Sequence, residues 1–186
     1  MKMKKNKLII YIVAVFVLFI IPISTVWLKT DALRNGEEFL FKVEAFDPYD
    51  MFRGNYLFIN FVEQEVKGKY SEEGEYDDWY YATISKDEDG FAYFSDISLE
   101  RPNERSNYYK TRGYYRDYDQ TYRVVTPTRY YMNENKSLDA EEIYEDNIEN
   151  TYVKVRVKDG QMVIVGVYVN DVLIDTIEPV RPGDVH

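Results

Sequence analysis

The feature that most constrains this chain is an uncharged, strongly apolar stretch of twenty residues near its start, residues 8–27. As an α-helix with a rise of about 1.5 Å per residue, this stretch extends roughly 30 Å, which is the thickness of the hydrocarbon core of a bilayer. Pro22 is compatible with a membrane helix, because local adjustments satisfy the backbone groups that it frees. The sequence therefore predicts a transmembrane helix over residues 8–27 that binds the lipid bilayer.

The charges that flank this stretch predict its orientation. Four lysines and no acidic residue lie in the first seven positions: Lys2, Lys4, Lys5 and Lys7. Because basic residues stay on the cytoplasmic side, we expect residues 1–7 to form a cytoplasmic basic tail of a single-pass protein. The alternative is a cleaved signal peptide, but the apolar run exceeds the usual ~7–15 residues and no small-x-small site follows at once. In both cases the rest of the chain lies outside the cytoplasm, at the cell surface or in the periplasm.

Composition excludes several kinds of chemistry. The chain has no cysteine, and its one histidine is the last residue, His186. Disulfides, thiolate sites and histidine-based acid–base or metal chemistry are therefore not expected, and we predict no cofactor. The net charge is −10, although four of the basic residues lie in the N-terminal tail. An acidic body repels nucleic acid, so we expect no nucleic-acid partner.

The end of the chain is typical of an antiparallel β-meander. Two-residue turns, Asp159-Gly160 and Asn170-Asp171, separate strands predicted over residues 151–157, 161–169 and 172–177. In the first of these strands valines alternate with basic residues, so one face is expected to be buried and the other to meet water.

Further strands are predicted over residues 38–46, 56–62, 79–85 and 91–97, the last two joined by a turn at Asp89-Gly90. Residues 101–126 are rich in tyrosine and arginine, and we interpret them as a polar edge hairpin. A short helix is expected after Ser137, with apolar residues at helical spacing: Ala140, Ile143, Tyr144 and Ile148. The predicted fold is mainly β: one antiparallel sandwich or barrel-like domain over residues 37–178, a linker over 28–36 and a flexible tail over 179–186.

One segment combines two turns with a strand. Asp47-Pro48 is a turn signal, and Arg53-Gly54-Asn55 is a second one because Gly54 accepts positive φ at no steric cost. Aromatic and β-branched residues follow directly, from Tyr56 to Val62. Alternation places Leu57, Ile59 and Phe61 on one face of this strand.

This segment resembles the signature of the GDYXXLXY family, Gly-Asp-Tyr-x-x-Leu-x-Tyr, which an Asp-Pro and an Arg-Gly usually precede. The chain matches the pattern at five positions: Asp47, Pro48, Arg53, Gly54 and Tyr56. It departs from the pattern at three, with Asn55 for Asp, Ile59 for Leu and Phe61 for Tyr.

A second segment extends the resemblance. Some members of the family carry an Arg-Tyr-Tyr-Met followed by a Glu and an Ala-Glu pair, and this chain has Arg129, Tyr130, Tyr131, Met132, Glu134, Ala140 and Glu141. The resemblance implies a membrane-anchored envelope protein without an assigned activity. It also implies a multi-pass membrane protein as the partner, since relatives are commonly encoded beside such proteins.

We therefore expect an interaction module rather than an enzyme, with no catalytic residue and no metal site. The candidate binding residues come from the two segments: Asp47, Arg53, Gly54, Tyr56, Arg129, Tyr130, Tyr131 and Glu134. An envelope carbohydrate-binding protein is the alternative, because the many tyrosines can stack on sugars. A carboxylate-dependent glycan hydrolase also stays open, since carboxylates are frequent and their separations are not readable from sequence.

Overall fold

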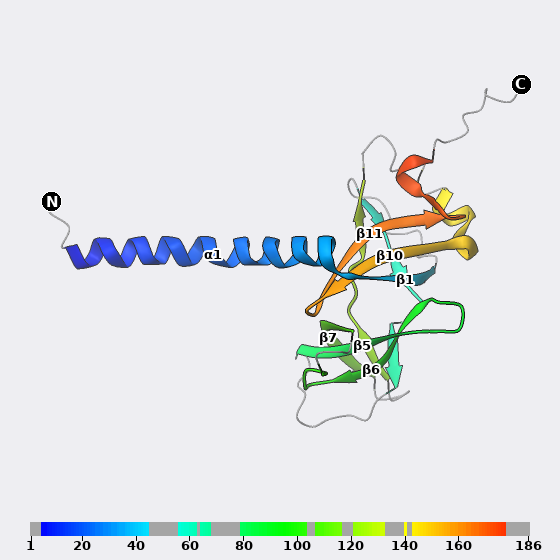
Figure 1. Ribbon diagram of the computed structural model, residues 1–186, viewed down its shortest axis with the longest axis horizontal. Helices are drawn as coiled ribbons and strands as arrows, with labels where there is room; N and C mark the ends of the chain where they lie inside the picture. Colours follow the sequence, from blue (N-terminus) through cyan, green and yellow to red (C-terminus); the bar gives the residue numbers. More distant parts are fainter. Residues whose placement is uncertain are drawn as a thin grey trace, which may run out of the picture.

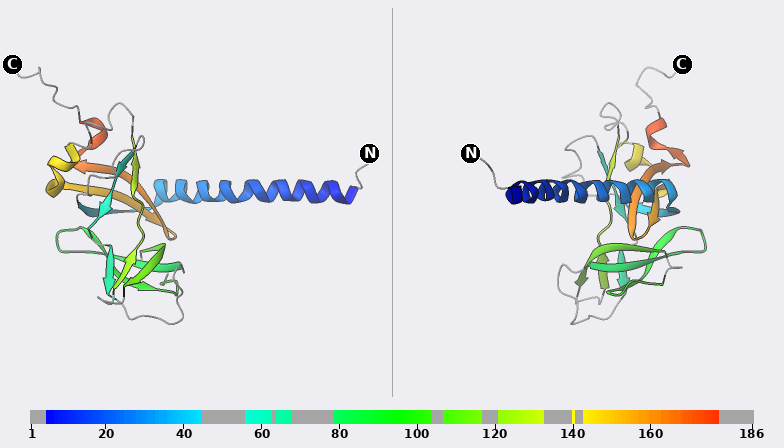
Figure 2. Two further views of the ribbon diagram at one scale, coloured as in Figure 1. Left: turned by 180° about the vertical axis from the view of Figure 1, so that it is seen from behind. Right: turned by 60° about the vertical axis from the view of Figure 1, so that its left-hand side comes forward.

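The computed structural model describes residues 5–44, 56–62, 64–67, 79–103, 107–116, 121–132, 140 and 143–177. A single long helix projects from a body made of antiparallel β-strands (Figure 1), and a view from behind gives the same arrangement (Figure 2). The body is a nearly closed, barrel-like arrangement of sheets. The predicted fold class, mainly β with one long apolar N-terminal helix, is thus confirmed.

Helix α1 comprises Lys5–Asn35, 31 residues that extend roughly 46 Å. From Ile9 to Trp27 every side chain is exposed. A helix that is apolar all round and not buried in its own protein has the character of a membrane span. Among the described residues α1 is the one helix long and apolar enough to cross a membrane.

The helix does not end where the apolar stretch ends. Residues 28–35, predicted as part of a linker, continue α1 without interruption. None of them is Gly or Pro, so nothing stops the helix before Gly36, whose N–H donates to the carbonyl oxygen of Ala32 at 2.9 Å. The linker prediction is therefore wrong over these residues: β1 begins at Glu37, directly after Gly36.

The first sheet has the strand order β12-β11-β10-β1-β3. Its members are β1 (Glu37–Glu44), β3 (Asn60–Phe61), β10 (Thr151–Lys158), β11 (Gln161–Val169) and β12 (Val172–Leu173). The predicted meander is confirmed: both of its two-residue turns have positive φ, 48° and 77° at Asp159 and Gly160 and 49° and 64° at Asn170 and Asp171. Its third strand is shorter than the predicted 172–177, because Ile174–Thr176 form a 3-10 turn. Such angles are those of the hairpin turn that matches strand twist.

The second sheet has the order β4-β8-β7-β5-β6. It comprises β4 (Glu65–Lys67), β5 (Trp79–Lys86), β6 (Ala92–Ser98), β7 (Tyr108–Arg116) and β8 (Thr121–Val124). The hairpin turn predicted between β5 and β6 is present, with φ of 87° at Gly90. The tyrosine-rich segment forms β7 and β8, but these are interior strands, so its interpretation as an edge hairpin is wrong.

Two extended segments join the sheets. One carries β2 (Tyr56–Phe58), β3 and β4, and the other carries β8 and β9 (Arg129–Tyr131). These two segments run antiparallel to each other. The backbone N–H of Ile59 donates to the Thr128 carbonyl oxygen, and the backbone N–H of Val124 donates to the Gln64 carbonyl oxygen. β2 and β9 form a separate two-stranded ribbon. The chain passes from one sheet to the other through these two segments, and their pairing links the two sheets.

The core lies between the two sheets. Phe41 on β1 contacts Phe61 on β3 edge-on, at 5.3 Å between ring centroids, and lies 5.4 Å from Phe94 on β6. Burial of each such ring contributes about 1.5–3 kcal/mol. The predicted inward face of the segment 56–62 is also confirmed, since Leu57, Ile59 and Phe61 are all buried.

Short helical segments close the end of the first sheet. Residues 140 and 143–146 are helical, and two 3-10 turns follow, η2 (Ile148–Asn150) and η3 (Ile174–Thr176). Ala140 and Tyr144 are buried, as the helical spacing predicted. Ser137 and the predicted tail, 179–186, lie outside the described residues.

Candidate functional site

The ribbon formed by β2 and β9 brings together the two segments that carry the candidate binding residues. Tyr56 lies opposite Tyr131, Leu57 opposite Tyr130, and Phe58 opposite Arg129. Because side chains alternate along a strand, Tyr56, Arg129 and Tyr131 share one face of the ribbon. We call these three residues the ribbon face.

Tyr56 contacts both other side chains of the ribbon face. The rings of Tyr56 and Tyr131 meet edge-on at 5.8 Å, and the Arg129 guanidinium lies 5.0 Å from the centroid of the Tyr56 ring. Tyr131 keeps 68% of its surface exposed. A guanidinium over an aromatic ring contributes about 0.5–1 kcal/mol at an exposed position, and both groups are frequent anchors of protein interfaces.

Tyr130 has a different role. Its side chain points to the other face of the ribbon and packs against the core, while its hydroxyl donates a short hydrogen bond to Asp175 on η3. Burial raises the pKa of Tyr130 well above the ordinary range, and the bond to the Asp175 carboxylate raises it further. Tyr130 therefore fixes the ribbon to the end of the first sheet rather than presenting a surface to a ligand.

Four of the predicted binding residues, Asp47, Arg53, Gly54 and Glu134, lie outside the described residues. Of the predicted set, the structure thus places Tyr56, Arg129, Tyr130 and Tyr131, and it brings all four together on one ribbon.

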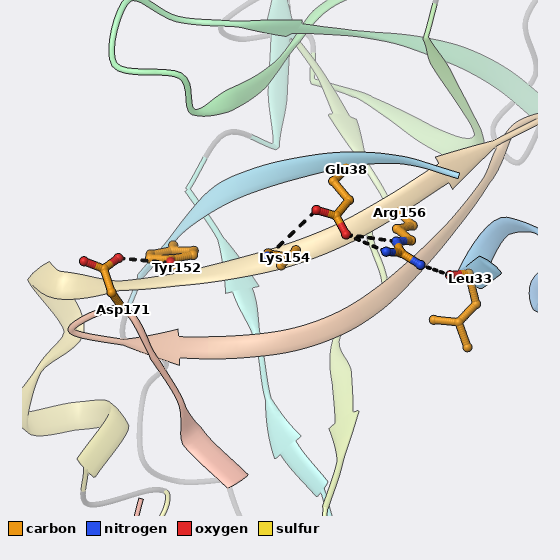
Figure 3. A network of polar contacts seen from close by, with 6 residues as sticks. All are labelled: Leu33, Glu38, Tyr152, Lys154, Arg156 and Asp171. Atoms are coloured by element: carbon orange, nitrogen blue, oxygen red, sulfur yellow. Dashed lines mark hydrogen bonds and ion pairs between the residues drawn. The ribbon is translucent and has the colours of Figure 1, made fainter. Parts of the chain in front are cut away.

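A second set of contacts, not predicted from sequence, fastens α1 to the body. Arg156 on β10 donates from Nη2 to Glu38 Oε1 at 2.7 Å and from Nη1 to the carbonyl oxygen of Leu33 at 2.5 Å (Figure 3). Lys158 pairs with Asp31 at 2.7 Å. Ala32 is fully buried beside these contacts. We call this set the helix junction.

Backbone packing and electrostatics reinforce the helix junction. A Cβ built on Gly36 would lie 2.4 Å from the Ala32 carbonyl oxygen and 3.1 Å from the Val157 nitrogen, so the backbones approach too closely for a side chain. The pKa of Glu38 is lowered, chiefly by the hydrogen bond from Arg156 and also by the charge of Lys154. Sequence separations of more than one hundred residues hide these pairs from sequence reasoning.

A buried glutamine clamps the two extended segments together. Gln64 Nε2 donates to Asn60 Oδ1 at 3.1 Å and to Thr126 Oγ1 at 3.2 Å, and its Oε1 accepts from Arg123 Nε at 3.2 Å. These bonds satisfy a side chain that is only 7% exposed. Gln64 therefore supports the segment that leads from β2 into the second sheet.

A cavity with a volume of about 670 Å³ lies at one end of the first sheet, where β1 ends and β10 begins. Phe91 and Tyr152 contribute rings, with centroids 6.1 Å apart, and the Tyr152 hydroxyl donates to Asp171 at 3.0 Å, as Figure 3 shows. Lys42 lies 4.8 Å from the Phe91 ring centroid. The cavity thus combines two aromatic faces with polar groups at its rim.

No cluster of three or more His, Asp or Glu side chains that could hold a metal ion occurs among the described residues. What the geometry does provide is an Arg129–Tyr56–Tyr131 surface on a ribbon, a helix fastened to the same body, and an open cavity at the end of the first sheet.

Comparison with curated proteins finds no match to this chain, and comparison with solved structures finds none either. The family whose model does match is the GDYXXLXY protein family, over residues 18–167. The match begins within α1 and includes both segments of the ribbon, so it covers most of the chain. The chain therefore belongs to the GDYXXLXY protein family.

Proposed function

We propose that this protein is a single-pass membrane protein whose β-body lies outside the cytoplasm and docks, without catalysis, on an integral membrane partner through the ribbon face. The lysines before the apolar stretch, Lys2, Lys4, Lys5 and Lys7, support a cytoplasmic N-terminus, because lysines beside a membrane helix stay on the cytoplasmic side. The body after Asn35 then lies on the opposite side, in the cell envelope.

The observation that carries the docking surface is the stack of Arg129 on Tyr56 beside the exposed Tyr131. Tyr56 belongs to the family signature and Arg129 to the second family segment, yet they are 73 positions apart and meet on one exposed face. Aromatic and arginine anchors on an exposed face suit the docking of a protein partner.

The helix junction supports a partner that is itself held in the membrane. Arg156 and Lys158 attach the body to the last turn of α1, so the ribbon face keeps one height and one orientation relative to the helix. A partner fixed in the same bilayer meets this surface in a single geometry, which lowers the entropic cost of association. A multi-pass membrane protein fits this requirement.

The experiment is affinity purification of the full-length protein from solubilised membranes, with identification of co-purified proteins by mass spectrometry. We expect a multi-pass membrane protein with the wild type and its loss with Tyr56→Ala and with Arg129→Ala. Tyr93→Ala and Arg101→Ala, which change the same residue types elsewhere on the body, are the matched controls and should retain it.

A photo-crosslinking amino acid at position 131 tests the surface directly. It should capture the same partner, whereas the same group at the exposed Val172 should not. Retention of the partner by both ribbon variants would refute the ribbon face as the site, and the absence of any membrane partner would refute the docking function.

Carbohydrate binding is a second candidate function, and the cavity beside the first sheet favours it. Rings of Phe91 and Tyr152 with polar groups around them form the type of surface on which a sugar stacks and donates hydrogen bonds. Binding of envelope glycans to wild type but not to Tyr152→Ala, with unchanged binding by Tyr56→Ala, would favour this candidate over protein docking.

A further inference from the structure

We propose that the side of the body next to α1 rests on the phospholipid headgroups of the same bilayer, with Trp79 as an interfacial anchor and Lys110 as a phosphate contact. This surface is distinct from the ribbon face, and it rests on the proposed anchoring of α1 in a membrane. Its members are Trp79, Tyr81, Lys110 and Arg112, which we call the membrane-proximal patch.

A series of contacts places the patch beside the end of α1. Lys158 pairs with Asp31 in the last turns of the helix, and the turn that follows Lys158 contains Gly160. The Gly160 carbonyl oxygen accepts from the backbone N–H of Lys110 at 2.9 Å. Because Trp79 pairs with Arg112 across β5 and β7, it lies on the strands that this contact holds against the turn between β10 and β11.

The side of the body that carries the patch extends beside α1 toward the helix N-terminus. In Figure 1 and Figure 2 the turn between β10 and β11, and the part of the second sheet that contains β5 and β7, extend alongside the C-terminal end of α1. The pairing of Lys158 with Asp31 sets the level of this side on the helix.

The height of this level matches the headgroup layer. Asp31 follows Trp27, the end of the apolar stretch, by four residues, or about 6 Å along the helix axis. The polar layer on each side of a bilayer is roughly 5–8 Å thick. The patch therefore lies at the depth of the headgroups when residues 8–27 span the hydrocarbon core.

The side chains of the patch suit that depth. Trp79 is 53% exposed, and the Lys110 ammonium and the Arg112 guanidinium each lie 5.4 Å from its ring centroid. Lys110 also lies 5.9 Å from the Tyr81 ring centroid. Tryptophan and tyrosine gather at membrane interfaces because their rings are apolar and their edges polar, and basic side chains reach the phosphates.

The chain offers a direct test, because it contains only two tryptophans, Trp27 and Trp79. Full-length Trp27→Phe, in which Trp79 is the sole tryptophan, is reconstituted into phosphatidylcholine bilayers that carry a fluorescence quencher either on the headgroup or at the end of the acyl chain. We expect the headgroup quencher to reduce Trp79 emission and the acyl-chain quencher to leave it nearly unchanged.

Three further variants separate the possible outcomes. In Trp79→Phe, Trp27 is the sole tryptophan, and its quenching by the lipid-attached quenchers reports whether α1 is in the membrane. A triple variant, Trp27→Phe, Trp79→Phe and Tyr131→Trp, places the reporter on the ribbon face and should show weaker headgroup quenching than Trp79. Lys110→Glu in the Trp27→Phe background should also reduce Trp79 quenching, with its circular dichroism unchanged.

Quenching of Trp27 without quenching of Trp79 would overturn the proposed headgroup contact and leave the anchoring intact. Absence of quenching at both tryptophans would instead overturn the anchoring on which the proposal rests.

Discussion

Lys158, near the end of β10, pairs at 2.7 Å with Asp31, which lies 127 residues earlier in the last turns of α1. Together with the bonds from Arg156 to Glu38 and to the Leu33 carbonyl, this pair converts an apolar anchor and a β-body into one unit. The helix junction therefore sets the position and orientation of the ribbon face and the membrane-proximal patch relative to α1.

Replacement of Gly36 tests the close packing of the helix junction. In Gly36→Ala the new Cβ meets the Ala32 carbonyl oxygen at 2.4 Å, and that atom belongs to the backbone, so the helix end or β10 must shift. We expect a loss of about 1–3 kcal/mol in the free energy of unfolding of the body. Chemical denaturation measures it, and Gly166→Ala is the control: its closest contact is the flexible end of Leu173, so its loss should be smaller.

The lowered pKa of Glu38 predicts a pH dependence of stability. A carboxyl whose pKa is lower in the folded than in the unfolded state stabilises the fold above its ordinary pKa, 4.5. This contribution is lost as the pH falls below that value and through the lower folded pKa. The melting temperature of Glu38→Gln should thus lie below that of wild type near neutral pH, and the difference should disappear in strong acid. A difference that persists unchanged there would contradict this role.

Tyr130 and Tyr131 should respond differently to removal of the hydroxyl group. Tyr130→Phe removes the hydrogen bond that Asp175 accepts from the Tyr130 hydroxyl at a half-buried position, which we expect to cost about 1.5–3 kcal/mol. Tyr131→Phe, on the exposed neighbour, should change stability by about 0.5 kcal/mol or less. Denaturation of both variants under one set of conditions measures the contrast, and equal losses would argue against the bond to Asp175.

The same tyrosine predicts an alkaline effect. Because the pKa of Tyr130 is raised in the folded state, its contribution to stability is complete below its ordinary value, 10.0, and is lost as the pH rises through the folded pKa. The stability difference between wild type and Tyr130→Phe should therefore narrow above about pH 10. A denaturation series at increasing pH checks this sign.

Gln64 should be one of the most sensitive polar positions. Gln64→Ala removes two donated bonds and one accepted bond from a buried site, leaving Thr126 and Arg123 without this partner. We expect a loss of about 1–3 kcal/mol in unfolding free energy. Gln161→Ala, at the half-exposed start of β11, is the matched control and should change it by about 0.5 kcal/mol or less. A loss at Gln161 as large as that at Gln64 would contradict the clamp.

The features that local chemistry determines could be predicted from the sequence. Asp159-Gly160 and Asn170-Asp171 adopt positive φ with little penalty, so the meander they join was recognisable without a structure. The alternation of Leu57, Ile59 and Phe61 likewise predicted which face of the segment 56–62 is buried. Each of these signals lies within a few residues of the structure it specifies.

Features set by distant contacts could not be predicted in this way. The end of the apolar stretch at Trp27 was interpreted as the end of the helix, but apolar composition does not mark where a helix ends, and this one continues to the first glycine. Lys110 and Arg112 suggested an edge strand, yet their charges lie over aromatic rings and β7 is interior. Nothing in the sequence around Glu38 or Arg156 indicates that these two residues pair.

The candidate site could be predicted only in part. Resemblance to the family selected Tyr56 and Arg129, while only the pairing of β2 with β9 shows that they touch. Asp47, Arg53, Gly54 and Glu134 lie outside the described residues, so their place in the site stays a prediction.

The continuity of α1 into its junction has a mechanical consequence. A flexible tether would let the body swivel freely, whereas an unbroken helix bound at Asp31 and Leu33 transmits torque. In the proposed topology, a partner that turns the ribbon through some angle must also turn the N-terminal end of α1, which lies on the other side of the bilayer.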